Sequence, residues 1–480
     1  MIKRREFIKK SALGTTGLAF SGMGSYSRHY NLFKGDFDEI EPIEAPFPMP
    51  QLQRPVFPEK IFDILKYGGI GDGATKNTIA FNEAIRACSA TGGGYVIVPE
   101  GKWLTGAIHL RSNVNLQLGK GAEIHFSDDP VDYLPVVFTR WAGVELMNYS
   151  PLIYAIDCEN IAITGPGKLF GHGQSWWGRE PKEEDTGQMI YNQMVLKNIP
   201  PEERIFGSRD IGLRPQLINP VRCRNVLLEG FTIAQPGPFW TIQFYLCENV
   251  IARRLNIRTK GGPNTDGINL DSTRNALVEH CLIDAGDDAV CLKSGKCEDG
   301  WRVGRPTENV VIRHVTCLSG HGGVVIGSEM SGDIHNVIAH DCNFDGTEIG
   351  IRLKSNATRG GIVEKIWCKN IRMKNIVYEA ISINTDYSGF TRKDAKAFPV
   401  FRDLQFNNII CDHARMAVSI TGKQELPIER ILIKDVSFKA EKGLVFQWVN
   451  DLKLINLKTK ITEGDPVSFF NCQAYGVYKD

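Results

Sequence analysis

The sequence lacks the features that mark a nucleic-acid-binding or membrane-spanning chain. It has 56 lysines and arginines against 55 aspartates and glutamates, a formal net charge of +1 at pH 7. This balance gives no reason to expect nucleic acid or an anionic membrane surface as the main partner. The weakly apolar run after Lys10 is too short to span a bilayer, and no cysteine follows it as a lipoprotein anchor would require.

Helical periodicity and metal-binding patterns are also scarce. Only residues 78–90, TIAFNEAIRACSA, predict an amphipathic helix, whose apolar face would contain Ile79, Ala80, Ala84, Ile85 and Cys88. No spacing of cysteines and histidines matches a zinc site. The chain is therefore neither a helical protein nor a zinc-stabilised one.

The N-terminal 60 residues predict export and a non-globular connection. Arg4 and Arg5 followed by the short apolar run resemble a bacterial twin-arginine export signal over residues 1–24. Residues 25–60 are rich in proline and predict an extended linker or strap. We expect an exported protein, in a periplasm or secreted.

The twelve cysteines do not follow the pattern of a disulfide framework. They recur at repeat positions, in one group at Cys158, Cys223 and Cys247 and in another at Cys281, Cys317 and Cys342. Free cysteine packs as a small hydrophobe, so we expect stacked free thiols in the core. A bridge such as Cys223–Cys247 is the alternative.

One short template recurs through the second half of the chain. It begins with asparagine and alternates apolar residues, as in NVLLEGFTI from Asn225. Further copies begin at Asn249, Asn275, Asn309 and Asn336, and weaker ones at Lys365, Asp403, Arg430 and Asp451. The first five copies are separated by 24, 26, 34 and 27 residues, a spacing typical of repeat architectures.

These repeats predict an all-β fold over residues 61–480. Each unit has short alternating runs broken by Gly, Asn or Asp. Short parallel strands joined by turns without crossover helices form a single-stranded parallel β-helix, a pectate-lyase-like solenoid. A β-propeller, the alternative, needs four hairpin-linked strands per blade and longer repeats. The helix at 78–90 would cap the first rung of the solenoid.

Four runs that end in serine align and bring polar residues into register. The serines are Ser272, Ser294, Ser328 and Ser355, and the apolar positions before them are Ile268/Leu270, Val290/Leu292, Val324/Ile326 and Ile351/Leu353. Strand parity sends these apolar residues to the core. In the same register Asp266 coincides with Asp288, and the preceding position holds Thr265, Asp287, His321 and Glu348. Arg352 and Lys354 have outward parity, so rungs ~4.8 Å apart predict one outer patch of acids, a histidine and two cations.

This patch has the residue types that glycoside hydrolysis needs. Three neighbouring aspartates repel one another when ionised, which raises the pKa of at least one. A protonated carboxylic acid beside an ionised carboxylate is the pair that cleaves a glycosidic bond. An arginine fork and a lysine charge suit a sugar that carries a carboxylate, a uronic acid. Each motif alone is also typical of solvated turns, and their shared register favours a site.

Four motifs in order carry a resemblance to a known family. NTD (264–266), GDD (286–288), GHG (320–322) and RLK (352–354) resemble the signatures of glycoside hydrolase family 28, the polygalacturonases. Leu353 stands where the family usually has isoleucine. The resemblance extends from YGGIGDG at Tyr67 through the repeats, and ISINTDY, ending at Tyr387, resembles the family segment that bears a substrate-contacting tyrosine.

The resemblance implies a right-handed β-helix and an inverting hydrolase of α-1,4-linked galacturonan in pectin, without cofactor or metal. By position it implies that Asp287 is the general acid, that Asp266 and Asp288 hold and deprotonate the water, and that His321 tunes the acid. Arg352 and Lys354 would grip a galacturonate carboxylate. The further substrate contacts it implies are Asn264, Tyr387 and Gln243.

Finer specificity rests on one segment. GSEMSG, from Gly327 to Gly332, resembles the exo-acting branch, which releases galacturonate from the non-reducing end. Trp176, Trp177 and Trp240 would either line the site or pack inside the protein. The alternatives are a galacturonidase for rhamnogalacturonan or other decorated pectin, a calcium-dependent pectate lyase on the same fold, and a non-catalytic glycan-binding β-helix.

Overall fold

The computed structural model describes residues 39–178, 186, 189–207, 212–387 and 397–477. The predicted export signal at 1–24 and the first part of the predicted linker lie outside these residues. Residues 43–480 form one compact unit. No helix among the described residues is both long and apolar enough to cross a membrane.

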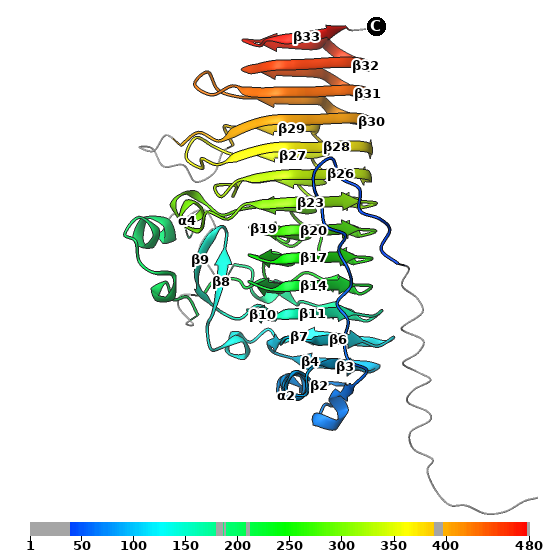
Figure 1. The fold of residues 1–480 in the computed structure, drawn as a ribbon, viewed down its shortest axis with the longest axis vertical. Helices are drawn as coiled ribbons and strands as arrows, with labels where there is room; N and C mark the ends of the chain where they lie inside the picture. Colours follow the sequence, from blue (N-terminus) through cyan, green and yellow to red (C-terminus); the bar gives the residue numbers. More distant parts are fainter. Residues whose placement is uncertain (1–38, 179–185, 187–188, 208–211, 388–396, 478–480) are drawn as a thin grey trace, which may run out of the picture. The chain divides into compact units, whose positions relative to one another are not determined.

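Nearly all described strands belong to one 31-stranded sheet, which winds as three parallel ladders (Figure 1). In each turn the chain adds one strand to each ladder in succession. The first ladder contains β1 (Ile61–Asp63), β3 (Gly94–Val98), β6 (Val114–Leu118), β11 (Glu159–Thr164), β14 (Arg224–Glu229), β17 (Glu248–Arg253), β20 (Arg274–Glu279) and β23 (Thr307–Arg313). The second contains β2 (Asp72–Lys76), β4 (Gly101–Thr105), β7 (Ala122–Phe126), β12 (Lys168–Phe170), β15 (Thr232–Gln235), β18 (Asn256–Arg258), β21 (Leu282–Asp284) and β24 (Thr316–Ser319).

The third ladder carries the predicted site. It contains β5 (Ile108–His109), β10 (Ile153–Ile156), β13 (Ile218–Val221), β16 (Ile242–Tyr245), β19 (Ile268–Asp271), β22 (Val290–Lys293), β25 (Val324–Ile326), β27 (Ile351–Lys354) and β29 (Glu379–Asn384). The later strands are longer and join ladders, so that β26 pairs with both β23 and β24. They are β26 (Ile334–Asp345), β28 (Ile362–Lys374), β30 (Val400–Thr421), β31 (Ile428–Gln447) and β32 (Val449–Phe470), and the short β33 (Ala474–Val477) pairs with β32.

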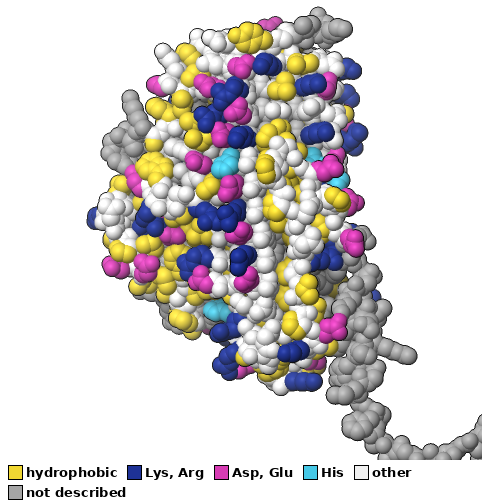
Figure 2. Space-filling model, viewed as in Figure 1, with side chains coloured by type: hydrophobic (Ala, Val, Ile, Leu, Met, Phe, Trp, Pro, Cys, Tyr) yellow, Lys and Arg dark blue, Asp and Glu magenta, His cyan; other side chains and the backbone are white. Residues whose placement is uncertain are grey.

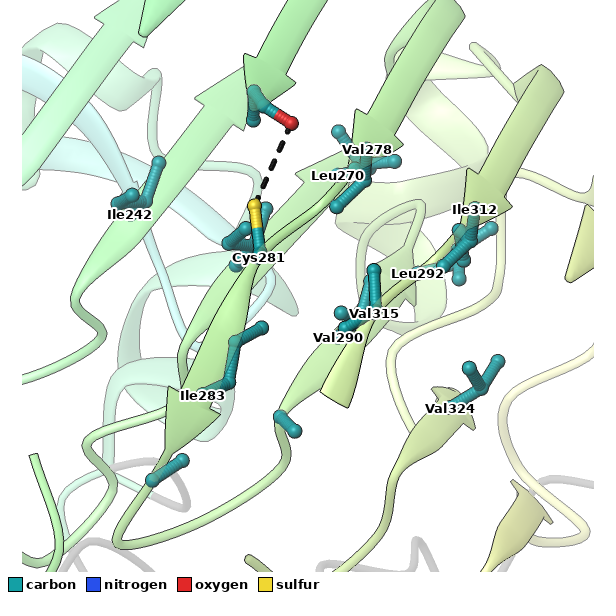
Figure 3. Packing of buried hydrophobic residues seen from close by; sticks show 14 of the residues in the cluster. Ile242, Leu270, Val278, Cys281, Ile283, Val290, Leu292, Ile312, Val315 and Val324 are labelled. Atoms are coloured by element: carbon teal, nitrogen blue, oxygen red, sulfur yellow. Dashed lines mark hydrogen bonds between the residues drawn. The ribbon is translucent and has the colours of Figure 1, made fainter. Parts of the chain in front are cut away.

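The core lies between the ladders, and its register is the predicted one. Ile268 pairs with Val290, Val290 with Val324, and Val324 with Ile351. All four side chains are buried. Figure 3 shows Val290 and Val324 among buried side chains of the other ladders, such as Val278 and Ile283. Alternation along each strand thus sends every second residue inward and leaves its neighbours on the outer face.

The asparagine that opens each template has a structural reason. Asn225, Asn249, Asn275, Asn309 and Asn336 adopt φ angles between 55° and 58°, the left-handed region that asparagine tolerates. The amide of each donates to the side-chain oxygen of the asparagine one rung earlier, at 2.9–3.1 Å. Each amide donates and accepts, so the stack satisfies its own polar groups. The weaker copies at Lys365, Asp403, Arg430 and Asp451 also have positive φ.

All twelve cysteines are free, as predicted, and Cys223 and Cys247 form no bridge. Cys158, Cys223 and Cys247 occupy the same corner of successive rungs, each with its carbonyl accepting the same kind of backbone hydrogen bond. The second predicted group is partly wrong. Cys317 pairs with Ile283 and Phe344, an inward position two residues after the one that Cys281 and Cys342 share.

Helix α2 (Thr78–Ala90) packs against the first rungs of the solenoid, as predicted for a cap (Figure 1). Its predicted apolar face needs one correction. Ile79 is 77 % exposed, and Phe81 is fully buried with Ala84, Ile85 and Cys88. Residues 81, 84, 85 and 88 follow the i, i+3, i+4, i+7 spacing, whereas position 79 lies on the far side of the helix.

The structure adds three kinds of element that the sequence did not predict: a hairpin, a second helix and short helical turns. An antiparallel hairpin, β8 (Val137–Trp141) and β9 (Val144–Asn148), and helix α4 (Cys297–Val303) pack beside the third ladder. Short helical turns lie in connections, at η1 (Ile64–Tyr67), η2 (Pro130–Tyr133), η3 (Gly173–Ser175), η4 (Tyr191–Val195) and η5 (Pro201–Glu203). Residues 43–58 run along the solenoid as an extended strap with Leu52 and Phe57 buried (Figure 1).

Candidate active site

The predicted acids and cations meet at one edge of the third ladder. Asp266 lies two residues before β19, and Asp287 and Asp288 lie three and two residues before β22. His321 precedes β25, and Arg352 and Lys354 belong to β27. Backbone hydrogen bonds from Gly267 to Asp288 (2.8 Å) and from His321 to Asp287 (3.0 Å) fix the predicted register.

Asp287 and His321 form a pair that reaches solvent. Nδ1 of His321 lies 3.0 Å from Oδ1 of Asp287, and Nε2 lies 3.8 Å from Glu348. The side chains of Asp287 and His321 are 16 % and 43 % exposed. Asp287 is therefore the acid of the three that a ligand on the outer face can touch.

Asp266 and Asp288 are buried, and each has a lysine partner. Nζ of Lys354 donates to Oδ2 of Asp288 at 2.9 Å, and Nζ of Lys293 lies 3.6 Å from Oδ2 of Asp266. Both aspartates are at most 2 % exposed. The Cys291 thiol also lies 3.5 Å from Oδ2 of Asp288, whereas Oδ1 of Asp288 is buried with no hydrogen-bond partner among the described residues. This oxygen is free to accept from a water.

The cations and the tyrosine form one wall. The guanidinium of Arg352 and the ammonium of Lys354 lie 5.5 and 5.4 Å from the ring centre of Tyr387. Arg352 also donates to the carbonyl of His321 at 3.4 Å. Both cations therefore face the acids from the rung of β27, where a carboxylate of a bound sugar would meet them.

Two of the predicted substrate contacts, Asn264 and Gln243, are hydrogen-bonded to other side chains of the protein. Asn264 is half-buried, and its side-chain oxygen accepts from Arg214 at 2.9 Å. Gln243 is fully buried in β16, where its oxygen accepts from Gln216 (2.7 Å) and its amide donates to Asp271 (2.9 Å). In this structure Gln243 offers no atom to a ligand, because the hairpin β8–β9 covers that part of the ladder and Gln216 itself donates to Arg140 of β8.

The pKa of Asp266 and the pKa of Asp287 shift in opposite directions. Burial, with Asp287 adding to it, raises the pKa of Asp266 well above its usual range. Burial would raise the pKa of Asp287 as well, but the hydrogen bond from His321 and the charges of Lys354 and His321 outweigh it and lower the pKa to about 2. The same hydrogen bond raises the pKa of His321. In the free protein the proton of this pair is therefore on His321.

Two groups of side chains could offer ligands to a cation. One oxygen each of Asp266 and Asp288 and the Cys291 sulfur lie within 4.8 Å of one another, as do ligand atoms of Asp287, Asp288 and His321. Lys293 and Lys354 already compensate the charge of these acids. The arrangement thus neutralises its carboxylates with side chains of the protein.

Sequence reasoning missed two residues that lie beneath the cluster, Lys293 and Glu329. Lys293, three residues after the predicted core position Val290, contacts Asp266 and also Glu329 at 3.1 Å. Trp240 packs under the ammonium of Lys293, 4.4 Å from the ring centre. The sequence contains a signal for each of them. Lys293 has outward parity on a strand of the site, and Glu329 lies in the GSEMSG segment. Trp176 and Trp240 are buried, so both pack inside the protein.

The comparisons with known proteins agree with this geometry. The model of the glycosyl hydrolases family 28 matches residues 88–451. The chain belongs to this family. It is 32 % identical over 399 residues to a probable polygalacturonase of Vitis vinifera, covering 80 % of this chain and 76 % of that protein.

Two solved structures show the same fold. A hyperthermoactive exopolygalacturonase from Thermotoga maritima superposes with a TM-score of 0.79 at 38 % identity, over 85 % of this chain and 93 % of that one. A family 28 exopolygalacturonase from Yersinia enterocolitica gives 0.74 at 24 % identity, over 87 % and 78 %. The predicted right-handed parallel β-helix is confirmed, and the chain is a glycoside hydrolase.

Proposed function

We propose that this hydrolase cleaves α-1,4-linked galacturonic acid in pectin or its oligosaccharides, acts from the non-reducing end and inverts the anomeric centre. The observation that carries the proposal is the meeting of Asp287, backed by His321, with Arg352 and Lys354 on neighbouring rungs. An exposed acid next to a cationic wall fits a glycosidic bond between sugars that carry carboxylates. The polygalacturonases among the relatives support the same substrate.

The roles follow from exposure as well as from charge. Asp287 reaches the outer face and donates the proton to the leaving oxygen, and His321, 3.0 Å away, holds that proton until the substrate is bound. One buried oxygen of Asp288 has no hydrogen-bond partner in the described part of the chain, and it accepts from the attacking water. Asp266 is buried too deeply to meet the leaving oxygen, so it serves on the water side with Asp288.

The exo mode rests on two supports. GSEMSG at 327–332 resembles the exo-acting branch, and both solved relatives described above are exopolygalacturonases. Rhamnogalacturonan or another decorated pectin is the second candidate substrate. It is disfavoured because Arg352 and Lys354, which suit galacturonate, are both present and face the acids.

A time course on a defined galacturonic acid oligomer tests the proposal. We expect monomer from the first minutes, β-configured by NMR before mutarotation, with no ultraviolet-absorbing product. Asp287→Asn should lower kcat by about 10²–10⁴-fold. Mixed short oligomers would overturn the exo mode, an absorbing product would indicate a lyase, and cleavage confined to rhamnose-containing pectin would replace the substrate.

A further inference from the structure

A second charged pair lies directly beneath the acids. Lys293 is 3 % exposed, and its ammonium is 3.1 Å from Oε2 of Glu329 and 3.6 Å from Oδ2 of Asp266. The ring of Trp240, 4.4 Å away, closes a third side. The ammonium is thus held in a fixed place between a carboxylate of the site and one outside it.

Glu329 is itself fixed from several directions. Its carboxylate accepts from the Ser328 hydroxyl at 3.0 Å and lies 3.8 Å from Arg359. Its carbonyl accepts from the backbone of Ser294 at 2.7 Å. The hairpin tip closes over it at Gly143, where φ is +87° and an added Cβ would lie 2.8 Å from the Glu329 side chain. A glycine at this tip permits the hairpin to exclude water from the pair.

Lys293 compensates the negative charge that surrounds Asp266. Asp287 and Asp288 face Asp266 from the turn before β22, Cys291 and Lys293 from β22, and Lys354 from β27. Lys354 bonds directly to Asp288, at 2.9 Å. Lys293 is therefore the cation that contacts Asp266 itself.

We propose that Lys293 is a positioning residue for the hydrolytic reaction, which holds the buried Asp266 in place and favours its ionised form, and that Glu329 sets the position of Lys293. The role of Asp266 on the water side rests on the proposed function, whereas the effect on its ionisation does not. Because an opposite charge nearby lowers the pKa of a carboxyl, removing the ammonium should raise the pKa of Asp266 by about 1–3 units. Glu329→Gln removes a negative charge but keeps an oxygen that can accept from Lys293, so the pKa of Asp266 should fall in this variant.

Two substitutions of opposite expected sign test the proposal kinetically. For Lys293→Met the acidic limb of the kcat/KM profile on a galacturonate oligomer should move to higher pH by about 1–3 units. For Glu329→Gln the same limb should move to lower pH. Lys293→Arg keeps the charge and is the matched control, with a limb close to the wild-type one. A purely structural role would lower activity without moving the two limbs in opposite directions, and that result would overturn the proposal.

An infrared titration decides the same point without any substrate. The absorption of protonated carboxylic acids in D2O is followed against pD, and the band of Asp266 is identified by its loss in Asp266→Asn. This band should persist to higher pD in Lys293→Met and disappear at lower pD in Glu329→Gln. An unchanged band in both variants, with thermal unfolding that shows them folded, would refute the proposal. Wild-type protein inert on galacturonan would refute the proposed function alone, because the titration still decides the role of Lys293.

Discussion

At the scale of the residue, three aspartates of the same chemistry receive different environments. Asp287 is 16 % exposed and bonded to His321, whereas Asp266 and Asp288 are buried beside lysines. Burial disfavours the charged form and a nearby cation favours it, so neighbours within 4 Å decide which acid carries the proton. In the proposed mechanism these neighbours, and not the aspartates themselves, decide which acid donates the proton and which acids hold the water.

The basic limb of the pH–rate profile should therefore belong to the pair of Asp287 and His321. The pKa of His321 is raised, so the pair keeps its one proton until the pH rises through that pKa, and activity is lost above it. His321→Gln keeps a hydrogen-bond donor but cannot hold the proton, so the limb should move to lower pH by about 1–3 units. The measurement is kcat/KM from pH 3 to 9, and a limb that stays in place would assign it to another group.

At the scale of the element, burial distinguishes two isoleucines of α2. Ile85→Ala should lower the free energy of unfolding by about 2–5 kcal/mol, because Ile85 is fully buried under the cap. Ile79→Ala, in the same helix but 77 % exposed, should change it by at most about 0.5 kcal/mol. Denaturant titration of both variants checks this. Equal losses would mean that helix propensity, and not the cap contact, decides the stability.

Repetition determines how much of this architecture could be predicted. The register of Ile268, Val290 and Val324 and the place of the acids follow from strand parity, which any one-residue slip would invert. The hairpin β8–β9 and α4 occur only once among the described residues, so no repeating sequence pattern predicts them. Lys293 has the parity of a solvated residue but is buried against Asp266, Glu329 and the ring of Trp240. Gln243, which the family resemblance assigned to the substrate, is fully buried because the same hairpin covers its part of the third ladder.

At the scale of the whole molecule, positive and negative side chains alternate along the solenoid. At one corner of the first ladder the register pairs Glu159 with Arg224, Arg224 with Glu248, and Glu248 with Arg274. Figure 2 likewise shows positive and negative side chains interspersed over the face drawn. A net charge of +1 is thus built from local pairs, which leaves the cationic wall at Arg352 and Lys354 as a specific feature rather than part of a basic face.

The strap gives the solenoid a connection that its repeats lack. A solenoid rung contacts only its neighbours, so its two halves can unfold separately. The ring of Phe47 lies 5.7 Å from that of Trp367 in β28, Arg54 pairs with Glu229 of β14 at 2.7 Å, and Phe57 packs on Tyr95 of β3 at 5.8 Å. One extended segment therefore ties late rungs to the first one.

Loss of this connection should separate the unfolding of the two halves. Phe47→Ala combined with Phe57→Ala removes both apolar anchors, and truncation of a buried phenylalanine such as Phe57 costs about 3–5 kcal/mol. We expect a lower Tm and a calorimetric transition that broadens or splits, because coupling across the rungs is lost together with stability. Val56→Ala, a strap residue that is 88 % exposed, is the matched control and should leave the transition unchanged. A double variant that unfolds at lower temperature in one equally sharp transition would show that nearest-neighbour contacts alone make the solenoid cooperative.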